Sequence, residues 1–125
     1  WTKQLGTSSA DAAYGVATDS SANVYVTGLT LGGLDGNTSS GSADLFVVKY
    51  NSSGTKQWTK QLGTSSQDSA NGVATDSSGN VYVAGGTYGG LDGNSGSGGN
   101  DFFVVKYNSS GTKQWTKQLG SSSPD

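Results

Sequence analysis

Carboxylate and amide side chains on glycine-rich stretches are the groups in this sequence best suited to chemistry. Asp35 and Asn37 lie within Leu34-Asp35-Gly36-Asn37, Asp44 opens the apolar run that follows, and the pattern returns 57 residues later. Hard cations such as Ca²⁺ take oxygen ligands from Asp, Asn and backbone carbonyls on such loops. The candidate metal ligands, with Ca²⁺ as the candidate ion, are Asp35, Asn37, Asp44, Asp92, Asn94 and Asp101.

The same residues are also typical of turns and strand ends. Asp and Asn side chains accept hydrogen bonds from nearby backbone N–H groups, which is a purely structural role. The Asp35-Gly36-Asn37 start resembles part of a calcium loop, but no Glu is present to give bidentate closure. The spacing is unlike an EF-hand. Both interpretations stay open, and we expect that folding requires no cofactor.

Enzymatic chemistry has few candidates. His, Cys and Glu are absent, so ordinary catalytic triads, thiol nucleophiles and zinc sites are excluded. Ser53-Gly54-Thr55-Lys56 spells the S-x-x-K of some serine hydrolases, but it spans a predicted turn instead of a helix start. Asp35 and Asp44 as a glycosidase pair lack apolar surroundings that would raise one pKa. We expect that the chain is not an enzyme.

Charge and composition restrict the partners. The net charge is −2 and Arg is absent, so the chain has no electrostatic footprint for nucleic acid. No apolar run is long enough to span a bilayer, so we expect no membrane insertion. Abundant Ser, Thr, Asn and Gly without Cys favour an extracellular or cell-surface location. The absence of Met and a repeated motif at both ends predict a processed chain or a segment of a longer array.

The chain is a tandem repeat. The hexapeptide Trp1-Thr2-Lys3-Gln4-Leu5-Gly6 returns at Trp58 and again at Trp115, and 45 of the 57 positions in the first period are identical in the second. Self-similarity at a fixed period of this length is typical of repeat architectures. One supersecondary unit should therefore recur and stack on its neighbours.

Each period contains two predicted hairpins. Residues 15–18 and 24–28 flank the turn Asp19-Ser20-Ser21-Ala22-Asn23, and residues 45–50 and 56–62 flank Asn51-Ser52-Ser53-Gly54. Four such strands make an antiparallel meander, and β-propellers are the commonest stack of these sheets. We predict an all-β fold of tandem four-stranded antiparallel β-propeller blades. The predicted units are residues 1–9 (outer strand of a preceding blade), 10–66 (first blade) and 67–123 (second blade).

Aromatic side chains at alternating strand positions have two interpretations. Tyr25, Phe46, Tyr50 and Trp58 are expected in the core, although rings of this kind also form stacking platforms for sugars. We expect the core. Tyr14 and Tyr88 have no aromatic counterpart in the other repeat, where Asn71 and Leu31 stand, so the scaffold does not require them.

The repeat resembles a known family. Asp44-Leu45-Phe46-Val47-Val48-Lys49-Tyr50, the Gly54 to Gly63 segment containing Trp58, and Gly79-Asn80-Val81-Tyr82-Val83 look like the SBBP-type β-propeller repeat. The resemblance covers essentially the whole chain. It implies a β-propeller in a large, mostly secreted or surface-attached bacterial or archaeal protein. It also implies a binding or display scaffold without shared catalytic residues.

Two blades cannot close a ring, because propellers typically have about four to eight. We therefore expect a structural or binding module whose partners are further blades of a longer chain or other copies of itself, with a glycan or protein as a further candidate ligand. One alternative is a self-assembling ring or filament that uses strand addition between chains. Another is a calcium-dependent or glycan-binding propeller that uses the loop between the second and third strands. The candidate interface residues are Trp1, Thr2, Lys3, Gln4 and Leu5.

Overall fold

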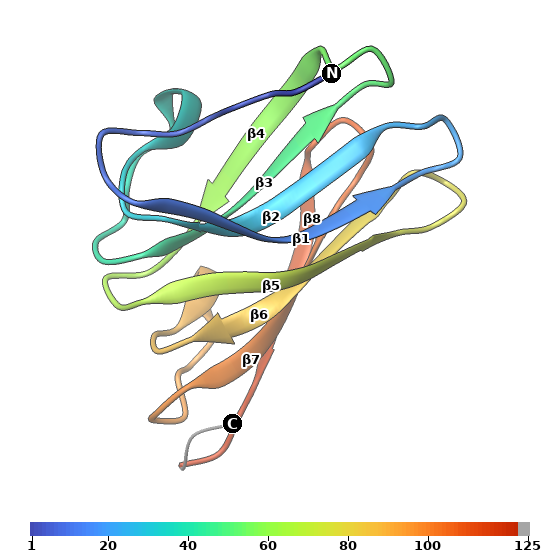
Figure 1. Ribbon diagram of the computed structural model, residues 1–125. Helices are drawn as coiled ribbons and strands as arrows, with labels where there is room; N and C mark the ends of the chain where they lie inside the picture. The colour runs from blue at the N-terminus through green and yellow to red at the C-terminus, as the bar shows by residue number, and fades with distance from the viewer. Residues whose placement is uncertain (123–125) are drawn as a thin grey trace.

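A computed structural model, which describes residues 1–122, folds into two four-stranded antiparallel sheets (Figure 1). Each sheet is a meander in chain order, as the turn chemistry predicts. We call the first sheet blade 1 and the second blade 2. Blade 1 contains β1 (Asp11–Thr18), β2 (Val24–Thr30), β3 (Asp44–Tyr50) and β4 (Lys56–Leu62), and blade 2 contains β5 (Asp68–Thr75), β6 (Val81–Thr87), β7 (Asp101–Tyr107) and β8 (Lys113–Leu119).

An Asp or Asn side chain at the start of each hairpin turn stabilises the turn by hydrogen bonds to the backbone. The Asp19 carboxylate accepts hydrogen bonds from the backbone N–H groups of Ser21 and Asn23, at 2.9 and 3.0 Å. Asn51 accepts in the same way from Ser53 and Thr55 in the second turn. The short polar side chain thus replaces the backbone contacts that the chain loses where it reverses.

A 3₁₀ turn interrupts the loop between the second and third strands of each blade. In blade 1 it spans η1 (Leu34–Gly36), and in blade 2 it spans η2 (Leu91–Gly93). Leu34, the first residue of its turn, is buried, while Asp35 has the left-handed backbone angles φ 48° and ψ 44°. The apolar leucine therefore anchors the loop on the sheet and leaves Asp35 at the surface.

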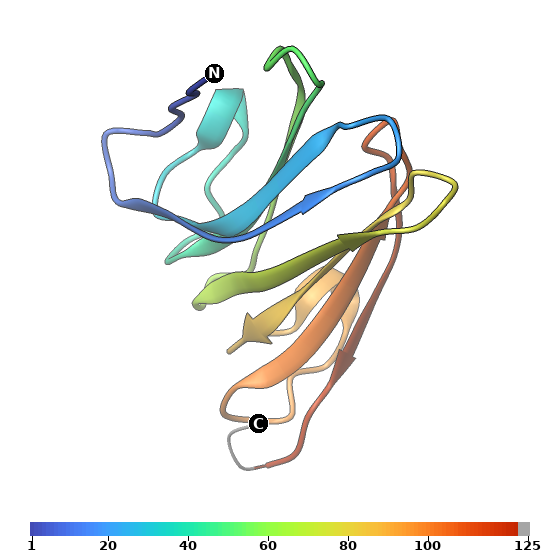
Figure 2. The same ribbon diagram turned by 45° about the vertical axis from the view of Figure 1, so that its right-hand side comes forward.

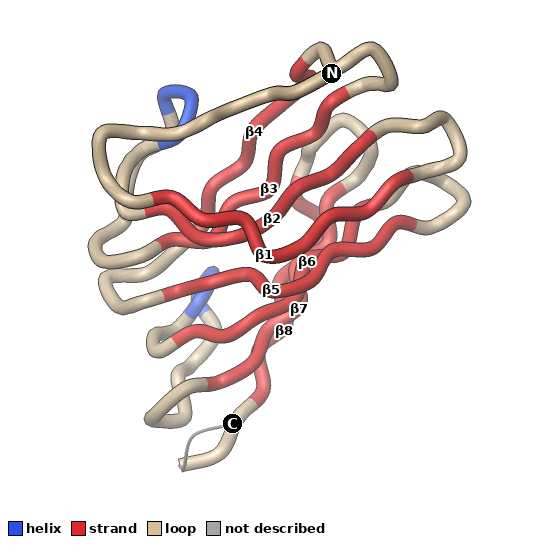
Figure 3. The backbone as a smooth tube through the Cα atoms, viewed as in Figure 1, coloured by secondary structure: helices blue, strands red, loops and turns tan. Residues whose placement is uncertain are grey.

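The main core lies between the two blades. Side chains alternate along β3, so Leu45 and Val47 face blade 2 whereas Phe46 and Val48 face the opposite way. The sheets stack face to face and fan apart from their first strands, β1 and β5 (Figures 2 and 3). The predicted core aromatics Tyr25, Phe46 and Tyr50 are buried and Trp58 is half-buried, which confirms the core interpretation.

Residues 1–10 contain no strand, although the sequence predicts an outer strand at residues 1–9. The segment lies across blade 1 without joining its sheet (Figure 1). The predicted second unit, residues 67–123, ends at a position outside the described residues. Within residues 1–122, no helix is long and apolar enough to cross a membrane.

Candidate functional site

The predicted ligand Asp35 forms an ion pair in the structure. Its carboxylate lies 2.8 Å from the Lys56 ammonium nitrogen and also accepts a hydrogen bond from the Thr59 hydroxyl. Burial alone would raise the pKa of Asp35, but the contacts with Lys56 and Thr59 outweigh it and lower that pKa. Asp92 pairs with Lys113 at 2.8 Å in blade 2. A strand side chain of the same blade therefore neutralises each of these carboxylates.

The amides Asn37 and Asn94 serve the loop itself. Each side chain donates a hydrogen bond of 2.7 Å to the carbonyl oxygen of the leucine three residues earlier. This contact closes the 3₁₀ turn and fixes the exit of the loop. The turn interpretation of these residues is therefore supported by their geometry.

Asp44 and Asp101 are buried at the start of β3 and β7. One carboxylate oxygen of Asp44 accepts from Ser40 N and from the Gln61 amide, at 2.8 and 2.9 Å. The other oxygen has no hydrogen-bond partner. It lies against Gly63, where an added Cβ would be only 2.1 Å away, so a side chain larger than glycine's would displace the carboxylate.

A second buried carboxylate, Asp68, stands beside Asp44. The N–H of Asp68 donates to the carbonyl of Ala43 at 2.7 Å, which joins the first residue of β5 in blade 2 to the residue just before β3 in blade 1. Burial raises the pKa of Asp68 despite hydrogen bonds from Thr87 and Thr64, and the charge of Asp44 adds to the rise. Asp44 and Asp68 thus bring carboxylates of both blades together at one end of the sheets, which we call the rim.

The candidate ligands do not converge on one ion. Among residues 1–122, no group of three or more His, Cys, Asp or Glu side chains is placed to hold a metal. Asp35 and Asp92 are ion-paired, and Asp44 and Asp101 each lie against a glycine, Gly63 and Gly120. The calcium site stays a prediction, and thermal unfolding in Ca²⁺ and in a chelator would test it.

Gln61 is a rim residue that sequence reasoning missed. Its amide accepts from Leu34 N at 2.9 Å and donates to the Gly32 carbonyl at 2.8 Å, besides its contact with Asp44. It therefore ties the long loop of blade 1 to β4, and Gln118 repeats the two loop contacts in blade 2. Its place in the hexapeptide that occurs three times was the available signal.

The larger of the two buried hydrophobic clusters in residues 1–122 lies between the blades. Tyr25, Leu45 and Val47 of blade 1 share one buried cluster with Val83, Phe103, Val105 and Tyr107 of blade 2. Burial of this apolar surface is the main favourable term that joins the sheets. One backbone carbonyl of blade 2 fixes the orientation of the blades further. The Lys49 ammonium and the Trp58 indole N–H both donate hydrogen bonds to Ser109 O, at 3.0 and 3.2 Å.

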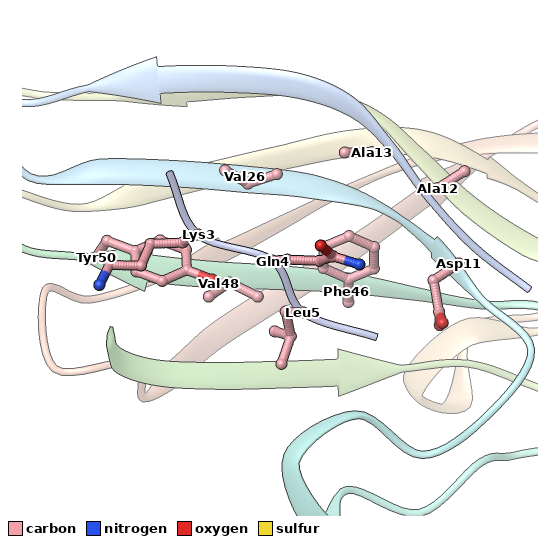
Figure 4. A pocket seen from close by; sticks show the side chains of 10 residues that line it. All are labelled: Lys3, Gln4, Leu5, Asp11, Ala12, Ala13, Val26, Phe46, Val48 and Tyr50. Atoms are coloured by element: carbon pink, nitrogen blue, oxygen red, sulfur yellow. The ribbon is translucent and has the colours of Figure 1, made fainter. Parts of the chain in front are cut away.

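The face of blade 1 turned away from blade 2 contains a cavity. We call it the leading face, defined by Ala13, Val26, Phe46, Val48 and Tyr50. These residues line a space of about 260 Å³ together with Lys3, Gln4, Leu5, Asp11 and Ala12 (Figure 4). The positions 57 residues later, which include Ala70, Val83, Phe103, Val105 and Tyr107, form blade 2's half of the buried interface.

The opposite face of blade 2 presents apolar side chains to solvent. We call it the trailing face, defined by Tyr82, Phe102, Val104, Trp115 and Leu119. Phe102 is 49 % exposed and Leu119 is 65 % exposed. The corresponding positions of blade 1, Leu45 and Leu62, are buried and half-buried against blade 2. The two faces therefore carry the two halves of the interface that already exists inside the chain.

The candidate interface residues Trp1 to Leu5 lie over the leading face. The Trp1 indole N–H donates to Ser52 O at 3.1 Å, and Leu5 packs against the cluster of Phe46, Val48 and Tyr50. Thr2 is exposed, as are Lys3 and Gln4. Tyr14 and Tyr88, the unmatched tyrosines, are 54 and 56 % exposed.

Comparison with known proteins agrees with this geometry. A family model described as the SBBP beta-propeller repeat matches residues 1–35 and 57–92, which together make up more than half of the chain. Each match begins at or next to a Trp-Thr-Lys-Gln-Leu segment and continues through two strands of the following blade. No curated protein matches the chain. The chain belongs to the SBBP beta-propeller repeat family.

Proposed function

We propose that this chain is a non-enzymatic structural or binding module of an extracellular or cell-surface protein. Its two blades are completed by further blades, which come from a longer polypeptide or from other copies of the chain. The lack of His, Cys and Glu supports the non-enzymatic role, because the usual nucleophile and base pairs cannot be assembled. Composition and the family resemblance support the location.

The observation that carries the proposal is the correspondence between the leading and trailing faces. Leu45 is fully buried inside the chain, whereas Phe102, at the same position of the next blade, is 49 % exposed. Ala70 is fully buried and Ala13, its counterpart, is exposed. The sequence of a blade is suited to a neighbour on each side, and exposed apolar faces of this kind mark interaction sites.

The hydrogen bonds of the internal interface have matching groups on the outer faces. Lys49 and Trp58 donate to Ser109 O inside the chain, and the matching residues are Lys106, Trp115 and Ser52. Docking of one copy's trailing face on another's leading face would place these groups together. Such a head-to-tail contact gives a ring if the rotation closes and a filament if it does not.

The experiment is the solution mass of the 125-residue chain by light scattering over a range of concentrations. We expect multiples of the 12.6 kDa chain that increase with concentration. Phe102→Lys places a charge on the trailing face at a position that is already exposed, so the chain should fold and remain at its monomer mass.

Tyr88→Lys is the matched control for this charge. Its counterpart Leu31 remains 44 % exposed even though blade 2 covers blade 1, so position 88 should lie outside a docked interface. The Tyr88→Lys variant should therefore associate like the wild type. A wild-type chain that remains a monomer at all concentrations would contradict self-assembly.

A further inference from the structure

The N-terminal segment, residues 1–5, has the same sequence as residues 58–62 of β4 and 115–119 of β8. These three copies have different surroundings. β4 is the last strand of blade 1 and packs through Trp58 and Leu62 against blade 2, β8 is the last strand of blade 2 and leaves Trp115 and Leu119 exposed, and the N-terminal segment joins neither sheet. The position of the N-terminal segment on blade 1 therefore has to be explained by contacts other than strand pairing.

The contacts of Trp1 reproduce those of Trp58 one blade further on. The Trp1 and Tyr50 ring centroids are 5.9 Å apart, and those of Trp58 and Tyr107 are 6.2 Å apart. The indole N–H of Trp1 donates to Ser52 O at 3.1 Å, as that of Trp58 donates to Ser109 O at 3.2 Å. The N-terminal segment thus occupies on blade 1 the place that β4 occupies on blade 2.

Glycine and cavity geometry extend the match along the segment. An added Cβ on Gly54 would meet Trp1 at 2.8 Å, and one on Gly111 would meet Trp58 at 2.9 Å. Residues 3–5 border a space of about 330 Å³ with Tyr50 and the following turn, and residues 60–62 border one of about 340 Å³ with Tyr107. The position is defined over the whole length of the segment.

The N-terminal segment is held less firmly than β4. Trp1 is 62 % exposed and, within residues 1–122, pairs with the single aromatic ring of Tyr50, whereas the ring of Trp58 contacts Tyr25 at 6.2 Å as well as Tyr107. A docking second copy would present Trp115 together with Tyr82, Phe102 and Val104. In that copy Tyr82 already supports Trp115 at 6.3 Å.

We propose that the N-terminal segment is a displaceable plug, which occupies in its own chain the seat for strand β8 of a second copy. This inference rests on the proposed function, because it requires assembly through the leading and trailing faces. The N-terminal segment and a partner's β8 cannot occupy the seat together. Assembly therefore begins with release of the N-terminal segment, which weakens association of the intact chain.

Two double variants with identical chemical changes test the competition. Trp1→Ala/Leu5→Ala weakens the plug, and we expect association of the full chain to become about tenfold tighter in analytical ultracentrifugation. Trp115→Ala/Leu119→Ala removes the same side chains from β8, where they are 38 and 65 % exposed. Association of this variant should become about tenfold weaker while the monomer stays folded.

The results for the two variants distinguish failure of the plug hypothesis from failure of the assembly hypothesis. Association that Trp1→Ala/Leu5→Ala weakens or leaves unchanged would overturn the plug but leave assembly intact. Monomers in the wild type and both variants would overturn both. Circular dichroism of each variant checks that the β-sheet signal persists.

Proteolysis at Lys3 is a second measurement of displacement. Trypsin should cleave after Lys3 faster in the assembled wild type than in the monomer, and equal rates would also contradict displacement.

Discussion

The indole ring of Trp1 lies 5.9 Å from the ring of Tyr50 and tilts by 39° against it. Trp58 and Tyr107 repeat this pair at 6.2 Å and 34°. Blade 1 thus makes with a detached segment the contact that blade 2 makes with a complete neighbouring sheet. In both blades the same face of the sheet therefore binds a Trp-Thr-Lys-Gln-Leu segment, whether or not that segment is part of a sheet.

The burial difference between equivalent positions predicts unequal costs of truncation. Leu45→Ala removes a fully buried side chain between the blades and should lower the free energy of unfolding by about 3 kcal/mol. Phe102→Ala removes a larger side chain at the same position of blade 2, but this one is 49 % exposed and should cost about 1 kcal/mol or less. Urea unfolding below the concentration at which the chain associates would measure both. Equal costs would show that the interface between the blades does not hold them together.

The first turn of each blade offers a reciprocal pair of substitutions. Ala22 has φ 63°, a conformation that L side chains rarely adopt, while Gly79 has φ 78° in the equivalent turn of blade 2. Ala22→Gly should therefore stabilise the chain by about 1 kcal/mol, and Gly79→Ala should destabilise it by a similar amount. Thermal unfolding would show the midpoint rising for the first variant and falling for the second. A decrease for both would contradict the strain at Ala22.

Gly63 makes the close approach to Asp44 that the rim requires. A methyl group there would lie 2.1 Å from a carboxylate oxygen, so Gly63→Ala should cost about 2 kcal/mol through displacement of the buried acid. The control is Gly72→Ala, because a Cβ on Gly72 meets nothing within 4 Å. That variant should change stability by about 0.5 kcal/mol or less. Denaturant midpoints of the two variants that coincide would argue against the packing at Gly63.

The pKa of Asp76 predicts acid sensitivity. Hydrogen bonds from Asn80, and then from Tyr82 and Ser78, lower this pKa to about 2 from 3.8. Because the folded-state pKa lies below the unfolded value, the contribution of Asp76 to stability is present above pH 3.8 and is lost as the pH falls toward 2. Unfolding in urea between pH 5 and pH 2 should therefore show a smaller decrease in stability for Asp76→Asn than for the wild type.

Asp68 changes the pH dependence of stability in the direction opposite to Asp76. Its raised pKa means that the folded chain holds the proton more tightly than the unfolded chain, so its unfavourable term grows as the pH rises above 3.8. Asp68→Asn should remove this term and leave a steeper loss of stability on acidification than in the wild type. Parallel pH profiles for the two variants, Asp76→Asn and Asp68→Asn, would contradict the assignment.

The strand meander could be predicted because the turn chemistry is local. Asp19 and Asn51 begin the two hairpin turns of blade 1, and the Asx-Ser-Ser pattern fixes where the chain reverses. The alternation at Leu45 to Tyr50 then places side chains on two faces. The partners of the rim acids could not be predicted in this way, because Lys56 reaches Asp35 across 21 residues and no local pattern links them.

The fate of residues 1–5 shows a further limit of sequence reasoning. All five match residues 58–62 of β4, yet β4 is a strand and they are not. A strand requires a hydrogen-bonding neighbour, which β3 provides for β4 and no strand within residues 1–122 provides for the N-terminal segment. The same dependence on neighbours separates the buried Leu45 from the exposed Phe102.

The most direct test of head-to-tail docking is a crosslink between two single-cysteine variants, because the chain has no Cys of its own. Inside the chain, Asp68 N donates to Ala43 O at 2.7 Å, and the matching positions on the outer faces are Asp11 and Asn100. Ala10→Cys and Asn100→Cys therefore place thiols on opposite faces, beside this contact. With a short thiol crosslinker, a mixture of the two variants should yield a covalent dimer that neither variant forms alone. Association by light scattering without this crosslink would contradict docking in the register of the internal interface.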